Sequence, residues 1–138
     1  MENAQLATKL RQAYEQWAAS KGMSNAHWFE LMAPEVHFQS LGDGARGLDF
    51  TAPKKGREGV HAYFDGLAAD WEMLHFIVDD IIVDGTRAAV QLNMAWRNKH
   101  TGRVLNSKKA DIWRFENGLA VDFMEYYDTR AAVAAAER

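Results

Sequence analysis

Four long runs rich in β-branched and aromatic residues fill the second half of the chain and constrain the fold most strongly. They cover residues 72–84, 87–98, 103–116 and 119–128. Turn-forming dipeptides separate them at Asp84-Gly85, Thr101-Gly102 and Asn117-Gly118. Because such dipeptides favour tight hairpin connections, the pattern predicts a meander of four long antiparallel strands.

The first half of the chain is predicted to be mainly helical. An apolar stripe with three- and four-residue spacing predicts a helix over residues 4–20; its members are Leu6, Leu10, Ala13, Tyr14 and Trp17. Ser24 or Asn25 can cap a short second helix, and a third spans about residues 57–69. Between them, alternation at 36–41 predicts a short strand, and the glycines and proline of 42–56 predict a loop.

Three helices followed by one sheet predict an α+β fold, in which a cone-shaped, curved antiparallel sheet wraps over the three N-terminal helices. The chain has 138 residues, the usual size of one domain, so we expect a single domain over 1–138. The alanine-rich segment 129–138 is predicted to be a helical, frayed C-terminal tail.

Composition excludes several classes of function. The net charge is −3 and no block of Lys and Arg stands out, so we expect no nucleic-acid partner. No apolar stretch approaches the ~20 residues of a membrane span, and no signal peptide is visible, so we expect no membrane association and a cytoplasmic location. Cysteine is absent and no metal-binding histidine motif or phosphate loop is present. We therefore predict no metal and no cofactor.

Two adjacent stretches carry a resemblance to known proteins. Residues 110–118 (Ala-Asp-Ile-Trp-Arg-Phe-Glu-Asn-Gly) and 121–129 (Val-Asp-Phe-Met-Glu-Tyr-Tyr-Asp-Thr) together resemble the last hairpin of SnoaL-like polyketide cyclases and ketosteroid isomerases. The helix opening at 56–64 resembles the third helix of the same families. The resemblance implies the cystatin-like α+β barrel of the nuclear transport factor two-like superfamily, a fold that hosts enzymes and plain binding modules alike.

The resemblance also implies roles for single residues. Asp111 occupies the position of the protonated acid that donates a hydrogen bond to the developing enolate in ketosteroid isomerases. Tyr14, or Trp17 one turn later, is the nearest match to the isomerase oxyanion tyrosine, and Ser40 falls where the isomerase has its general base. Glu125 lies near a carboxylate position of limonene epoxide hydrolases. The isomerase set is therefore incomplete, and ketosteroid isomerase activity is not implied.

Alternation along the last two strands gives an independent reason to consider the two acids. Asp111 shares a strand face with Lys109, Trp113 and other residues; Glu125 shares one with Leu119, Val121, Phe123 and Tyr127. If both faces line the cone, two carboxylates enter one apolar cavity, where burial and mutual repulsion raise a carboxyl pKa and create an acid and a base. Alternatively, each acid pairs with a neighbouring cation, Lys109 or Arg114.

These observations favour a cofactor-free acid/base enzyme of isomerase, cyclase or dehydratase/lyase type. Its substrate would be a small hydrophobic or aromatic ring-containing molecule, with Asp111 and Glu125 as catalytic residues. The predicted substrate-binding residues are Tyr14, Trp17, Trp28, Ser40, Trp113, Phe123 and Tyr127.

Two alternatives stay open: a non-catalytic domain that binds a small ligand, and a dimeric assembly domain. The assembly alternative uses the alternating residues of the second long strand, Val90, Leu92, Met94 and Trp96, provided that they point away from the helices. Since relatives commonly dimerise through the sheet, we expect a homodimer in either case.

Overall fold

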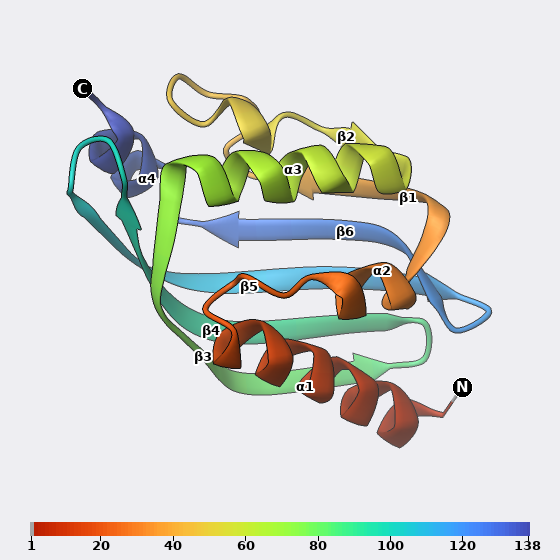
Figure 1. The fold of residues 1–138 in the computed structure, drawn as a ribbon. Coiled ribbons are helices and arrows are strands. Elements are labelled where there is room, and N and C mark those ends of the chain that lie inside the picture. The colour runs from red at the N-terminus through yellow and green to blue at the C-terminus, as the bar shows by residue number, and fades with distance from the viewer. Residues whose placement is uncertain (1) are drawn as a thin grey trace.

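The computed structural model describes residues 2–138 and confirms the α+β class (Figure 1). The helical elements are α1 (Asn3–Ala19), α2 (Ala26–Leu31), η1, a short 3-10 helix (Asp49–Thr51), α3 (Gly56–Asp70) and α4 (Thr129–Ala136). The strands are β1 (Met32–Ser40), β2 (Lys54–Lys55), β3 (Trp71–Asp84), β4 (Arg87–Asn98), β5 (Val104–Glu116) and β6 (Leu119–Tyr127).

The six strands form one curved sheet in the order β2-β1-β6-β5-β4-β3. Strands β3 to β6 form the predicted antiparallel meander, within about two residues of the predicted bounds. One pairing differs from a wholly antiparallel sheet, because β1 lies parallel to β6. These two strands are joined through α3 and the whole meander rather than by a hairpin, so a parallel pairing is sterically open to them.

Helices α1, α2 and α3 cover one face of the sheet (Figure 1). The predicted stripe of α1 is buried there, and so is the alternating set of β4, namely Val90, Leu92, Met94 and Trp96, each less than 10% exposed. The expectation that this β4 set forms an outer assembly face is therefore wrong. The helices need an apolar surface to pack on, and this face of β4 supplies it.

A bulge changes the alternation near the start of β6. The register shifts between Arg114 and Phe115, so that Phe115 pairs with Ala120, which is fully buried. Leu119 and Val121, predicted to face inward with Phe123, are only half-buried. A bulge places two residues opposite one, and the side chains beyond it change face. The pairs closer to the middle of the sheet keep the predicted alternation.

Helix α4 is packed against the fold rather than frayed. Ala132, Ala135 and Ala136 are buried. The Asp128 side chain accepts a hydrogen bond from the Ala131 amide at 2.9 Å. The hydroxyl of Thr101 donates to the Ala135 carbonyl at 2.6 Å. Alanine side chains let the helix approach closely, and these bonds fix its two ends. No helix within residues 2–138 is both long and apolar enough to cross a membrane.

The contact between α3 and the segment before it can be tested at Gly66. A Cβ atom added there would lie 2.4 Å from the Cβ of Phe50, well inside van der Waals contact. We expect Gly66→Ala to lower the free energy of unfolding by about 1–3 kcal/mol, measured by urea denaturation. The control is Ala62→Gly at an exposed position of the same helix, which measures the difference in helix propensity between alanine and glycine without a change in packing. A gain of about 0.5–1 kcal/mol for Gly66→Ala would contradict the packing described here, since helix propensity alone predicts that gain.

Candidate active site

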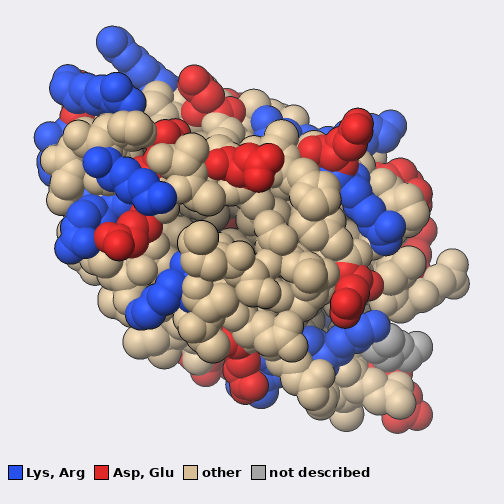
Figure 2. All heavy atoms as spheres, viewed as in Figure 1, with Lys and Arg blue, Asp and Glu red and all other residues tan. Residues whose placement is uncertain are grey.

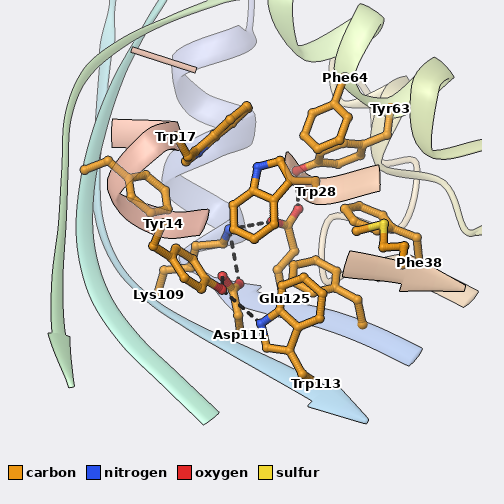
Figure 3. Close-up of a pocket in the computed structure, with 13 residues that line it drawn as sticks. Tyr14, Trp17, Trp28, Phe38, Tyr63, Phe64, Lys109, Asp111, Trp113 and Glu125 are labelled. Carbon is orange, nitrogen blue, oxygen red and sulfur yellow. Dashed lines mark hydrogen bonds and ion pairs between the residues drawn. The ribbon is translucent and has the colours of Figure 1, made fainter. Parts of the chain in front are cut away.

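The centre of the cone holds a buried lysine between two carboxylates (Figure 3). Asp111 on β5 and Glu125 on β6 are direct cross-strand partners, and both are less than 5% exposed. Lys109, two residues before Asp111 on the same face of β5, places its Nζ 2.7 Å from Glu125 Oε1 and 3.1 Å from Asp111 Oδ1. The two acids therefore share one cavity, which the sequence left conditional on both strand faces lining the cone, and they also pair with one cation, Lys109.

Each carboxylate also accepts a hydrogen bond from a tyrosine on a different helix. Tyr14 of α1 donates its hydroxyl to Asp111 Oδ2 at 2.5 Å, and Trp113 Nε1 donates to the Tyr14 hydroxyl at 3.0 Å. Tyr63 of α3 donates to Glu125 Oε2 at 2.6 Å. The polar centre thus ties both long helices to the middle of the sheet.

The two carboxylates are paired in the same way. Each accepts a hydrogen bond from one tyrosine and places its other oxygen beside Lys109. Asp111 Oδ1 is buried and accepts no hydrogen bond from any of residues 2–138, so the ion pair with Lys109 is its polar contact. The Lys109 ammonium lies closer to Glu125 than to Asp111, at 2.7 Å against 3.1 Å.

Burial sets the protonation states of the cluster. Desolvation raises the pKa of Asp111; the positive charge of Lys109 opposes this shift and the negative charge of Glu125 adds to it. Burial alone would lower the pKa of Lys109, but the two carboxylates outweigh it and the net shift is upward, so this lysine stays charged. Burial also raises the pKa of Tyr14 and of Tyr63 well above the ordinary value, so both remain neutral donors.

Two small chambers meet at this cluster. The first chamber has a volume of about 40 Å³ and is walled by aromatic side chains around Asp111, among them Trp17, Trp28, Trp113 and Phe123. The second chamber, of about 50 Å³, lies toward α4. Tyr63, Lys109 and Glu125 line both. Each volume suits about one or two water molecules, so a ring-containing ligand requires side chains to move.

The predicted site residues fall into two groups. Those lining the first chamber are Tyr14, Trp17, Trp28, Asp111, Trp113, Phe123 and Glu125. Tyr127 lines the second chamber instead, and its hydroxyl lies 2.8 Å from Ser40 Oγ. Ser40 lines neither chamber. Burial raises the pKa of Tyr127 to about 12, so its hydroxyl is a neutral hydrogen-bonding group.

Two residues of the cluster were not among the predicted site residues. The sequence indicates Lys109 only as a possible ion-pair partner of the acids, although it lies on the same strand face as Asp111 and is the cation nearest to it in the sequence on that face. Tyr63 gave a weaker signal: it lies on the apolar stripe of α3 three residues after Val60 and four before Leu67. Within residues 2–138, no three His, Asp or Glu side chains gather in a way that could hold a metal ion.

Comparison with known proteins identifies the family. The model of the SnoaL-like domain matches residues 10–123, so the chain belongs to the SnoaL-like domain family. No curated protein matches the sequence.

Solved structures share the fold over almost the whole chain. An NTF2-like protein of unknown function from Burkholderia pseudomallei is 26% identical, with a TM-score of 0.83 and full coverage of both chains. TerC, co-crystallised with polyporic acid, is 14% identical, with a TM-score of 0.78 and coverage of 96% of this chain and 98% of its own. A protein with a ketosteroid isomerase-like fold from Catenulispora acidiphila, in complex with trimethylamine, is 16% identical, with a TM-score of 0.70 and coverage of 87% and 88%.

The bridging role of Lys109 predicts a large, pH-dependent loss of stability when the cation is removed. Lys109→Met leaves two buried carboxylates without a counter-charge, so we expect about 3–5 kcal/mol less unfolding free energy at pH 8. Without the lysine, the carboxyl pKa values rise, and protonation at pH 4 relieves the repulsion, so the loss should be smaller there. Urea denaturation at both pH values measures this, with the exposed Lys108→Met as control. Equal losses for the two variants at pH 8 would contradict a bridging lysine.

Proposed function

We propose that the protein is a cofactor-free acid/base enzyme in which Asp111 transfers a proton to and from a small apolar ligand. One observation carries the proposal: Asp111, a buried carboxylate whose pKa is raised by burial, lines an apolar chamber. A carboxyl group whose pKa is raised by burial is a stronger base than one in water, and the same group serves as the acid that returns the proton.

The contacts of the cluster give its members different parts in this reaction. Asp111 Oδ1 takes the proton from an acidic C–H or O–H of the ligand and later delivers it to another atom of the same molecule. Lys109 and the hydroxyl of Tyr14 hold Asp111 in place and keep its pKa from rising further. Glu125 has the closer contact with Lys109, 2.7 Å against 3.1 Å for Asp111, so we assign it to positioning Lys109 rather than to proton transfer.

A buried ion cluster is a poor way to stabilise a fold. Replacing such a cluster by well-packed apolar residues is often neutral or stabilising, because desolvation of the charges offsets their attraction. Perturbed titratable groups lining a cavity are therefore candidates for function. The solved relatives with trimethylamine and polyporic acid bound support a small molecule as the ligand class.

Non-catalytic binding is the second candidate, and the Lys109 bridge favours it. A lysine that pairs with both carboxylates is expected in an ion cluster whose role is structural. In that case the chamber sequesters a small apolar molecule, and Asp111 Oδ1 accepts a hydrogen bond from it without taking the proton.

Hydrogen–deuterium exchange separates the two candidates. We would incubate small cyclic enones in D₂O and follow loss of the proton adjacent to the carbonyl group by NMR. Acid/base catalysis predicts accelerated exchange that falls about 10²–10⁴-fold in Asp111→Asn, which cannot take up the proton. The exposed Asp80→Asn is the matched control. Binding of an enone without accelerated exchange would reject the enzyme and leave the binding module.

We also propose that the chain forms a homodimer through the outer face of its sheet. Because β4 buries its apolar set under the helices, the exposed apolar residues lie on the opposite face: Ile77 is 56% exposed, Tyr126 44% and Ile112 41%. Ile112 and Tyr126 come from the neighbouring strands β5 and β6, and Ile77 from the edge strand β3. Large apolar side chains gathered on one face commonly mark an interface.

Sedimentation equilibrium at micromolar concentration tests the dimer. The proposal predicts a dimeric mass for the wild-type chain and a monomeric mass for Ile112→Glu, which places a charge in the interface. Leu41→Glu, which changes an exposed apolar residue in the turn after β1, is the control. A monomeric wild-type protein rules the interface out.

A further inference from the structure

A surface cleft lies between the end of α1, the end of α3 and the adjoining parts of β3 and β4. Its volume is about 500 Å³, roughly ten times that of either internal chamber. Leu67, Trp71 and Trp96 line both this cleft and the second chamber. These shared side chains therefore separate the cleft from the second chamber. We call the cleft the basic cleft.

Positive charge predominates at the rim of the basic cleft, although the whole chain carries a net charge of −3. Lys21, Arg97 and Lys99 line it against one acid, Glu72, which pairs with Arg97 at 2.8 Å. Within residues 2–138, neither Lys21 nor Lys99 has a carboxylate within 4 Å. Lys and Arg side chains gather at the left of the face in Figure 2, where α3 ends.

Both lysines are held by backbone contacts. Lys21 Nζ donates to the Leu74 carbonyl at 2.7 Å, and Lys99 Nζ donates to the Ala68 carbonyl at 2.6 Å. An ammonium group has three donors, so each lysine retains two for a ligand. These bonds fix the two charges at the rim, and the ordering that a binding site requires is already present.

A second, independent feature of the cleft calls for a ligand. Trp71 is only 4% exposed, and its indole Nε1 is buried with no acceptor among residues 2–138. Most buried donors in proteins are paired, and an unpaired one often marks an unfilled contact. The Trp71 side chain that carries this donor lines both the basic cleft and the second chamber.

We propose that the basic cleft binds an apolar organic anion, a carboxylate or sulfonate attached to a hydrophobic or aromatic body. Lys21 and Lys99 bind the anionic group. The apolar body lies against Leu67, Trp71 and Trp96, and Trp71 Nε1 donates to an acceptor on the ligand. This site is separate from the proton transfer assigned to Asp111, and its existence does not depend on that assignment.

A matched pair of fluorescent probes tests the charge requirement. The anion is 8-anilinonaphthalene-1-sulfonate, and N-phenyl-1-naphthylamine is the same ring system without the sulfonate. The double variant Lys21→Gln/Lys99→Gln should bind the anion about three- to tenfold more weakly at low ionic strength and the neutral probe within about twofold of wild type. Lys9→Gln/Lys108→Gln, which lies outside the cleft, should bind both as wild type does. Unchanged affinity for the anion in the double variant would overturn the proposal.

A variant that is expected to bind the anion more tightly controls for misfolding of the double variant. Glu72→Gln removes the one acid that lines the cleft among the described residues and frees Arg97, so it should tighten binding of the anion about two- to threefold and leave the neutral probe unaffected. If the double variant loses both probes, this variant decides: tighter binding of the anion supports the site, and unchanged binding rejects it.

The position of the probe is tested by the indole N–H signals in ¹⁵N-correlated NMR spectra. The signal missing from Trp71→Phe identifies Trp71, and the anion should shift that signal more than those of Trp28 and Trp113. The larger shift at the latter two would place the probe in the first chamber and overturn the proposal. The same measurements on Asp111→Asn should match wild type, so failure here is distinguishable from failure of the acid/base function.

Discussion

The ion pairs of Lys109 with Asp111 and Glu125 are the interaction on which the rest of the site depends. Two carboxylates directly opposite each other on neighbouring strands cannot both be charged in an apolar interior without a cation between them. The strand itself supplies that cation, because Lys109 lies two residues before Asp111 and so on the same face. Tyr14 and Tyr63 then complete the cluster from α1 and α3. The polar centre therefore fixes both long helices against the sheet, and the aromatic walls of the first chamber are arranged around it.

The position of the cluster is what points to chemistry rather than to structure alone. Asp111 and Glu125 both line the first chamber, and each is held by one tyrosine and by Lys109. Perturbed titratable groups at a cavity wall are candidates for function. The two chambers on either side of the cluster, and the larger basic cleft outside them, share walls made of a few aromatic and apolar side chains. Movement of those side chains would enlarge the space available to a ligand without disturbing the strands that carry the charges.

Much of this could be predicted from the sequence, and the failures have identifiable physical causes. The turn dipeptides located β3 to β6, and alternation put Asp111 and Glu125 each on a face with apolar neighbours. That the two acids are direct cross-strand partners depends on the register of β5 and β6, which is uninterrupted between Lys109 and Arg114 and which alternation does not fix. Alternation did not predict that Leu119 and Val121 are only half-buried, because a bulge adds a residue there and no local sequence pattern indicates it. Alternation also cannot say which face of a sheet the helices cover, so the outward direction of the β4 set was only a condition of the assembly alternative. The parallel pairing of β1 with β6 and the contact of Tyr63 with Glu125 both depend on segments more than 60 residues apart, which only the tertiary fold brings together.

The most direct test of the account is a carbon-detected NMR titration of the Asp111 carboxyl in the wild-type protein and in Tyr14→Phe. Burial beside Glu125 predicts a pKa above the ordinary aspartate value in the wild type. Loss of the Tyr14 hydrogen bond, which favours the charged form, predicts a further rise in the variant. The ordinary aspartate value of about 3.9 is the reference. An Asp111 that titrates at or below that value in both proteins would show that the carboxylate is solvated or fully neutralised by Lys109. That result would contradict the proton-transfer role proposed for it.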